Sequence, residues 1–282
     1  MWKLKQPRLA HDALLADIRA ARGISDQLHL WWLGQSGFLA LWQGRHLLFD
    51  PYLSDSLTNK YAATDKPHVR MSERVVEPAR LDFVDVVTSS HNHTDHLDAE
   101  TLGPILQANP EITIVVPAAN QAFAAERLRV EPRRNTPVDA GQSFSVAGFT
   151  LHAVPAAHET LDRDEQGQHR YLGFVARCGP HTIYHSGDTV RFEGMVDWLR
   201  PFEIDIAILP INGRLPERRV SGNLWGREAA ELAHDIGARL LIPCHYDMFE
   251  FNTVTPEECR SAAAELKQPL RVLELGERFS WG

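Results

Sequence analysis

The stretch SSHNHTDHLD, residues 89–98, places His91, His93, Asp95 and His96 within six residues. Imidazole and carboxylate groups are poor filling for an apolar core, so the cluster needs another explanation. In an extended segment His91 and His93 point the same way, because side chains alternate along a strand. The spacing therefore predicts two neighbouring cation sites, one with His91 and His93 and the other with Asp95 and His96. The alternative is a solvated polar loop, which four such residues at this spacing disfavour.

Three more chemically suited residues also follow strand-like runs. LHAVPAA runs into His158, HTIYHSG into Asp188, and ARLLIPC into His245. Loops at the ends of rigid strands are common places for functional sites. We expect His158 to give the first cation its third nitrogen and His245 to complete the second. Asp188 would bridge both, because a carboxylate can bind two cations, and Gly187 before it permits close backbone approach.

Each of these three residues also has a simpler interpretation. His158 could be a surface turn residue, Asp188 could cap a turn, and His245 could be a core histidine bonded to the backbone. Asp50 ends the strand-like run HLLFD and is expected to accept a proton from a ligand imidazole, outside the direct ligands. A set of nitrogens with hard oxygens suits two divalent ions, Mn²⁺ or Zn²⁺.

Short apolar runs rich in β-branched and aromatic residues predict many strands, including LHLWWLG, FLALW, ITIVVP, YLGFVAR and IDIAILP. Helices are predicted in DAETLGPILQA, NQAFAAERLR, GREAAELAHDIG and TPEECRSAAAELK. Strands in hairpin-like groups early in the chain, with helices between later strands, indicate large mixed sheets covered by helices.

Composition is that of an ordinary globular chain. The 282 residues are 44% hydrophobic and 23% charged, with a net charge of −8. The acidic balance disfavours a nucleic-acid partner, and no apolar run approaches a bilayer span. Residues 1–25 lack the features of a signal peptide and predict a helical extension with Leu14, Leu15, Ile18 and Ala21 on one face. A cytoplasmic location is expected, and homo-oligomerisation is left open.

The HNHTDH motif, followed in order by His158, Asp188 and His245, resembles the metallo-β-lactamase superfamily of binuclear metallohydrolases. The resemblance implies that one ion is bound by His91, His93 and His158. It implies a second ion bound by Asp95, His96 and His245, with Asp188 bridging the two ions. It also implies a four-layer αββα sandwich and a single domain over residues 1–282. WWLGQSGF, HSGDT, DIAILPINGR and IPCHYDMF further resemble the L-ascorbate-6-phosphate lactonase branch.

This resemblance implies a hydrolase that opens a small polar ester or lactone, such as a sugar-phosphate lactone, with a hydroxide shared by two metals. Asp95 and Asp188 are the predicted catalytic residues. The superfamily's redox branch has an acidic residue where this chain has His93, which favours hydrolysis. The alternatives are a small-molecule phosphodiesterase or nuclease on the same site, and a non-catalytic metal-binding scaffold.

Two segments without regular periodicity, residues 59–71 and 211–223, are long enough to be binding loops. They carry positive charge on an acidic chain, which predicts that they bind an anionic group of a small-molecule substrate. A guanidinium can bind phosphate oxygens in pairs, and Arg70 and Arg214 are the favoured ligands because Pro67 or Gly213 nearby would fix or permit a close approach of the backbone. The alternative is that both segments are solvated loops with exposed cations.

Overall fold

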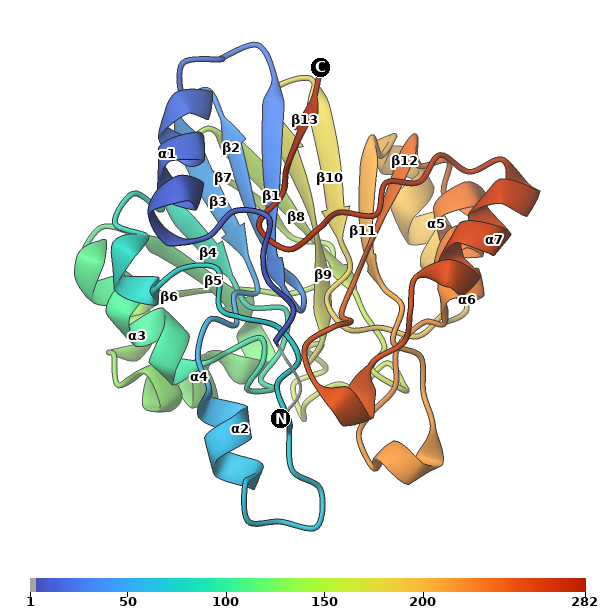
Figure 1. Cartoon of the computed structure of the whole chain (residues 1–282), viewed down its shortest axis with the longest axis horizontal. Coiled ribbons are helices and arrows are strands. Elements are labelled where there is room, and N and C mark those ends of the chain that lie inside the picture. Colours follow the sequence, from blue (N-terminus) through green and yellow to red (C-terminus); the bar gives the residue numbers. More distant parts are fainter. Residues whose placement is uncertain (1–3) are drawn as a thin grey trace.

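Two β-sheets lie face to face in the computed structural model, which describes residues 4–282 (Figure 1). The first sheet has the order β13-β1-β2-β3-β4-β5-β6 and the second the order β12-β11-β10-β9-β8-β7. The strands of the first are β1 (Leu28–Gly34), β2 (Gly37–Trp42), β3 (Arg45–Phe49), β4 (Val86–Thr88), β5 (Thr113–Pro117), β6 (Asn135–Val138) and β13 (Arg278–Trp281). Those of the second are β7 (Ser143–Val146), β8 (Phe149–Pro155), β9 (Leu172–Cys178), β10 (His181–His185), β11 (Ile206–Pro210) and β12 (Leu240–Cys244).

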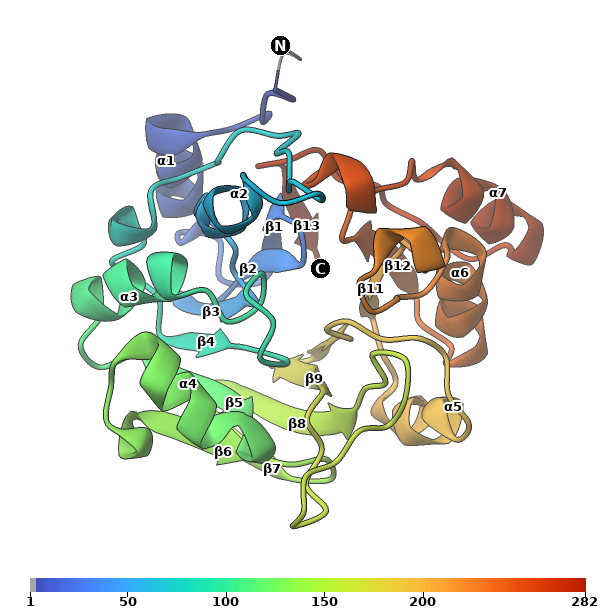
Figure 2. The ribbon, with the colours of Figure 1, turned by 90° about the horizontal axis from the view of Figure 1, so that it is seen from below.

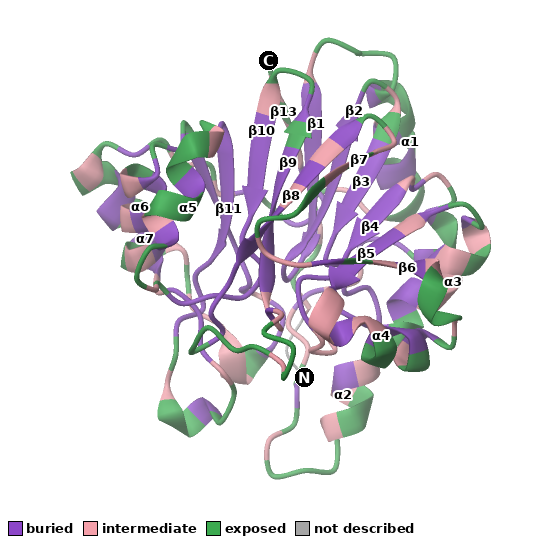
Figure 3. Ribbon diagram, turned by 180° about the vertical axis from the view of Figure 1, so that it is seen from behind, coloured by how far each residue is buried: buried purple, intermediate pink, exposed green. Residues whose placement is uncertain are grey.

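Most strands read as unbroken apolar runs because both of their faces are covered. Every residue of β1, β2, β11 and β12 is buried, with one face against the opposite sheet and the other against helices or chain segments (Figure 3). By contrast β7, at the edge of the second sheet, is only partly covered. The expectation of large mixed sheets is confirmed.

Helices cover the outer faces of both sheets and complete the four layers. The α-helices are α1 (His11–Ala21), α2 (Ser56–Tyr61), α3 (Ala99–Ala108), α4 (Gln121–Leu128), α5 (Met195–Leu199), α6 (Gly226–Asp235) and α7 (Glu257–Leu266). The first sheet is covered by α1, α3 and α4 and the second by α5, α6 and α7, whereas α2 covers neither face and lies beyond the lower end of the sandwich in Figure 1 (Figures 1 and 2). The predicted αββα sandwich is therefore confirmed. Among residues 4–282, no helix has the length and apolar character needed to cross a membrane.

The N-terminal helix forms where the apolar stripe predicts it. Leu14, Leu15, Ile18 and Ala21 are its buried residues, and all four belong to the main core. Packing of this face, rather than helix propensity, accounts for the stability of so short a helix.

Strand direction brings the predicted site residues to one edge of the sandwich. In the first sheet β3, β4 and β5 run parallel, and in the second β10, β11 and β12 do. Because β9 is antiparallel to both β8 and β10, β8 runs in the same direction as β10. The loops that follow β4, β8, β10 and β12 consequently gather at one end of the molecule (Figure 2).

The loop after β12 is braced by two segments distant in sequence. Met71 N–H donates a hydrogen bond to the carbonyl of Met248 (2.9 Å), and Lys5 N–H donates to the carbonyl of Met71 (2.8 Å). The Lys5 ammonium also forms an ion pair with Asp247. The N-terminal segment thus helps to fix the loop that carries His245.

Candidate metal centre

Three imidazoles form a first group of donor atoms. His91 and His93 follow β4, and His158 follows β8. One donor atom from each lies within 4.8 Å of those of the other two. Their ring centroids are 4.6 Å apart for His91 and His93, and 5.0 Å apart for His93 and His158. The structure therefore brings together the three residues predicted to bind the first ion.

A second group consists of Asp95, His96 and His245, again with donor atoms within 4.8 Å of one another. Asp95 Oδ2 lies 3.7 Å from His96 Nε2 and 3.4 Å from His245 Nε2. His245 reaches the site from the loop after β12, where its backbone is left-handed (φ 60°). Such a conformation is uncommon for a residue with a side chain and occurs often at functional sites.

Asp188 lies between the two groups. Its Oδ1 is 3.3 Å from His96 Nε2, and its Oδ2 is 3.1 Å from His245 Nε2 and 3.7 Å from His158 Nε2. A carboxylate in this position contacts both groups at once, which is the arrangement expected of a bridge. Gly187 makes the approach feasible, since a Cβ there would lie 2.5 Å from Ser90 Cβ and its φ is +60°.

The electrostatics of the site favour positive charge next to its carboxylates. Burial alone would raise the pKa of Asp188, but His245 and His96 outweigh it and hold that pKa well below its ordinary value. Burial alone would lower the pKa of His245, yet Asp188 and Asp95 raise it to about 9. In the first group, burial lowers the pKa of His158 to about 4. The carboxylates are therefore ionised and His158 is neutral, as metal ligands must be, whereas His245 carries a proton that metal binding would release.

The residues present fit divalent cations. Among residues 4–282, the buried atoms His91 Nε2, His96 Nε2 and Asp188 Oδ1 have no hydrogen-bond partner. Leaving such a group unpaired costs about 1–3 kcal/mol, so unpaired donor atoms clustered in one place call for a ligand. Imidazole nitrogens with carboxylate oxygens are a donor set that suits zinc or manganese.

Asp50 contacts the second group from behind. Its Oδ2 accepts a hydrogen bond of 2.7 Å from His96 Nδ1, which leaves His96 Nε2 facing Asp188 and Asp95. The same carboxylate accepts hydrogen bonds from Ser90 N–H (3.0 Å) and the Ser90 hydroxyl. Asp50 is fully buried and also has a left-handed backbone (φ 38°). This is the geometry of a residue that orients a metal-binding imidazole.

Replacing Asp50 by Ala should weaken metal binding by roughly 10- to 100-fold, because His96 would lose the acceptor that fixes its ring and tautomer. Competition with a chromogenic chelator would measure the change. Asp139→Ala is a matched control, because Asp139 also accepts a hydrogen bond from an imidazole (His169 Nδ1, 2.9 Å), and His169 belongs to neither ligand group. Equal affinities in Asp50→Ala and the unaltered protein would refute the orienting role.

Gln35 is a site residue that the sequence reasoning missed. Its Nε2 lies 2.8 Å from Asp95 Oδ2, to which it donates, and 3.1 Å from His245 Nε2. The main-chain carbonyl of Gln35 accepts a hydrogen bond of 3.0 Å from His245 N–H. The available signal was its place between Gly34 and Gly37, in the turn that joins two buried strands. Glutamine amides are rarely metal ligands, so the residue type did not indicate that Gln35 belongs to the site.

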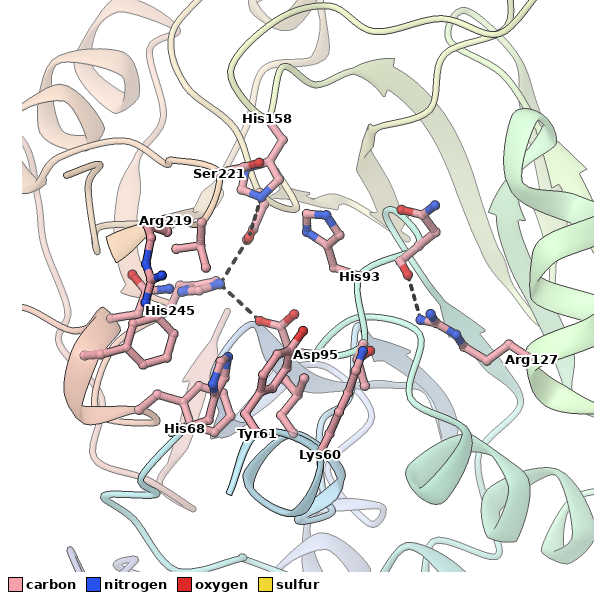
Figure 4. Close-up of a pocket in the computed structure, with 18 residues that line it drawn as sticks. Lys60, Tyr61, His68, His93, Asp95, Arg127, His158, Arg219, Ser221 and His245 are labelled. Atoms are coloured by element: carbon pink, nitrogen blue, oxygen red, sulfur yellow. Dashed lines mark hydrogen bonds and ion pairs between the residues drawn. The ribbon is translucent and has the colours of Figure 1, made fainter. Parts of the chain in front are cut away.

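The two groups open into a cavity of about 400 Å³ (Figure 4). His93, Asp95, His158, Asp188 and His245 lie in its wall. The remaining lining residues come from the loop after β4, from α2 and the segment that follows it, from α4, and from residues 219–221 and 249–252. They include Lys60, Tyr61, His68, Arg127, Arg219, Phe249 and Phe251.

The two arginines predicted to bind an anionic substrate do not line this cavity. Arg70 donates hydrogen bonds to the carbonyls of Ser72 (2.7 Å) and Ser54 (2.6 Å), so its guanidinium holds a loop together. Arg214 makes a two-pronged ion pair with Glu228, at 2.6 Å for each contact. The prediction is corrected for both residues, because each guanidinium is already engaged away from the metal groups. Lys60 and Arg219, from the same two segments, line the cavity instead.

Proteins of similar sequence include relatives named as metal-dependent hydrolases. A family model described as a beta-lactamase superfamily domain matches residues 45–246. A UPF0173 metal-dependent hydrolase of Caldivirga maquilingensis is 27% identical over 245 residues, which cover 86% of this chain and 93% of the relative. These findings support the superfamily and the metal-dependent hydrolases, and they do not support the narrower lactonase branch.

Solved structures show the same fold. The isothiocyanate hydrolase from Delia radicum gut bacteria superposes with a TM-score of 0.70 at 21% identity, covering 90% of this chain and all of that one. The metallo-beta-lactamase fold protein YhfI from Bacillus subtilis superposes with a TM-score of 0.66 at 18% identity. The superposition covers 91% of this chain and 100% of the YhfI chain. At these identities the likeness concerns the fold alone.

Proposed function

Because this chain belongs to the beta-lactamase superfamily and is a metal-dependent hydrolase, we propose that it opens a small polar ester or lactone at a centre of two divalent cations, manganese or zinc. The observation that carries the proposal is the position of Asp188 between two ligand groups that face one cavity. His91, His93 and His158 would hold one cation, and Asp95, His96 and His245 the other. Bound there, such cations supply Lewis acidity toward a carbonyl oxygen and acidify water.

Asp95 is the residue proposed to handle the proton. Burial alone would raise its pKa, but His96 and His245 lower it, so the carboxylate is ionised at neutral pH and can accept a proton. Gln35 fixes Oδ2 by donating to it. Asp95 would take a proton from the attacking water and return it to the leaving alkoxide. Ester and water then give acid and alcohol, and a lactone gives the open hydroxy acid.

Two positively charged side chains in the cavity wall, Lys60 and Arg127, are the evidence that the substrate carries an anionic group. Lys60 extends from the end of α2 with its ammonium 5.1 Å from the Tyr61 ring, and Arg127 extends from α4 with its guanidinium 2.7 Å from the Asn92 carbonyl. Among residues 4–282, neither forms an ion pair with a carboxylate, whereas Arg219 pairs with Asp65 at 2.9 Å. We therefore assign the anion-binding role to Lys60 and Arg127 in place of Arg70 and Arg214.

Lys60→Gln should lower kcat/KM for an anionic lactone about tenfold, the size of one charged hydrogen bond, and change that for its neutral counterpart less than about twofold. 6-Phosphogluconolactone and gluconolactone form a matched pair that differs by the phosphate. Hydrolysis above the spontaneous rate gives the readout. Lys66→Gln is the control, since Lys66 lies in the same segment but does not line the cavity. Equal losses on both lactones would assign Lys60 to the metal site or the fold.

The alternatives make different predictions on a substrate panel. The metal-loaded protein is incubated with a lactone series, with p-nitrophenyl esters and with bis-(p-nitrophenyl) phosphate. Metal-dependent turnover of carboxylic substrates supports the proposal. Preference for the phosphodiester would replace it by phosphodiesterase activity. Bound metal with no turnover of any substrate would favour a non-catalytic scaffold.

A further inference from the structure

A second, smaller group of apolar side chains lies apart from the main core. It consists of Tyr52, Leu57, Met248 and Phe249, with Tyr61 and Phe251 packed against it. The group joins α2 to the segment after β12, which are far apart in sequence. Four of its members also line the metal-site cavity: Leu57, Tyr61, Phe249 and Phe251. The group therefore forms one side of the cavity next to the metal groups.

Four rings make up most of this side, and we call Tyr61, His68, Phe249 and Phe251 the aromatic wall. His68 lies at its centre. Its ring stacks on Tyr61 with centroids 4.1 Å apart and planes 15° apart, and it meets Phe251 at 4.4 Å and Phe249 at 5.2 Å. Figure 4 shows Tyr61 and His68 across the cavity from His158.

His68 contributes to the wall as an uncharged ring. Burial lowers its pKa, a shift that the hydrogen bond from Nδ1–H to the Lys66 carbonyl (3.2 Å) opposes. The imidazole is therefore neutral at neutral pH and adds a flat surface instead of a positive charge. Positive charge next to the wall comes from Lys60, whose ammonium is 5.1 Å from the Tyr61 ring, and from Lys66, whose ammonium is 5.4 Å from the Phe251 ring.

The aromatic wall presents apolar ring surface that a purely polar substrate would leave uncovered. Tyr61 and Phe251 are only partly buried, although aromatic rings gain about 25 cal/mol for each Å² that is removed from water. Beside a metal centre lined by imidazoles and carboxylates, exposed ring surface of this kind suits a ligand that covers it. Flat conjugated groups do so best, because aromatic pairs favour offset stacking or edge contacts beyond simple burial.

We propose that the substrate carries an aromatic or other flat conjugated group that packs on the aromatic wall, together with an anionic group that meets Lys60 and Arg127. The inference rests on the hydrolysis proposed above and narrows its substrate class. It favours aryl or heteroaryl carboxylates and phosphates over saturated sugar derivatives. Tyr61 and Phe251 are the residues that set this specificity.

The direct test is binding of two hydroxy acids that differ in the flat group. 2-(Hydroxymethyl)phenylacetate and 5-hydroxypentanoate are the ring-opened forms of 3-isochromanone and δ-valerolactone, and both carry one carboxylate and one hydroxyl. Calorimetric titration of the metal-loaded protein should show about three- to tenfold tighter binding of the aromatic acid. Tyr61→Leu and Phe251→Leu should each remove most of that preference while binding of 5-hydroxypentanoate changes less than about twofold.

Trp198→Leu is the matched control, because Trp198 is an exposed aromatic residue that lines a different cavity, and it should keep the full preference. Equal affinities of the two acids for the unaltered protein, or a preference that survives both wall substitutions, would overturn the inference. The binding test is independent of turnover. Failure of the metal-loaded protein to open either lactone would refute the proposed hydrolysis and leave the binding result to decide on the wall.

Discussion

Replacing Asp188 by Ala is expected to lower kcat/KM by about 10³-fold or more while the chain remains folded. Asp188 contacts both ligand groups, at 3.1–3.7 Å from His245, His96 and His158. Its removal takes away the negative charge that lies between the two groups and leaves each group without this oxygen donor. The residue lies in a loop beyond β10, so the sheet itself keeps its packing.

Steady-state hydrolysis and thermal unfolding of Asp188→Ala would measure the two parts of this prediction. Asp205→Ala is the control, because Asp205 is also a buried carboxylate of the second sheet but precedes β11, at the other end of that strand. Its side chain accepts a hydrogen bond from Thr182 N–H (2.8 Å), so the control should lose stability and keep activity. Unchanged turnover by Asp188→Ala would rule out a bridging role.

The second large effect concerns Asp95. Asp95→Asn should lower kcat by roughly 10²- to 10⁴-fold, the contribution typical of a residue that moves a proton in the transition state. An amide of the same size keeps the loop packing but cannot accept a proton. The first ligand group does not include Asp95, so the variant should still bind at least one metal ion.

The measurements for Asp95→Asn are kcat across the pH range and metal content of the same preparation. Loss of activity with metal retained would separate proton transfer from metal binding. A kcat within about threefold of the unaltered enzyme would show that another group transfers the proton, and Gln35 would then hold Asp95 for structural reasons alone.

Large mixed sheets covered by helices, with a polar residue at the end of several strands, could be predicted from the sequence because they follow from short-range patterns, whereas the four-layer sandwich was implied by the resemblance to the metallo-β-lactamase superfamily. Apolar runs with period-two side-chain geometry mark strands, and the polar residue after each run marks the strand's end. His91 follows β4 of the first sheet and His245 follows β12 of the second, so their meeting at one end depends on how the two sheets pack and not on strand pairing. Gly187 is a further local signal, since a close approach to Ser90 requires a residue without a Cβ.

The anion-binding residues could not be assigned in this way, because a cation's role depends on which acceptors lie within reach. Arg214 looks available in sequence, yet Glu228 on α6 takes up its guanidinium. Arg70 is likewise engaged by backbone carbonyls, which no sequence pattern reveals. Arg127 lies on α4 and reads as an ordinary helix-surface residue, and only the tertiary packing places it at the cavity.

The most direct test of the proposed metal centre is the metal content of the purified chain, measured by elemental analysis and followed by calorimetric titration with Mn²⁺ and Zn²⁺. We expect up to two divalent ions per chain, with one lost in His93→Ala and the other in His245→Ala, because these residues belong to different groups. A chain that carries no metal and binds neither ion on titration would contradict the assignment of this cluster as a metal centre.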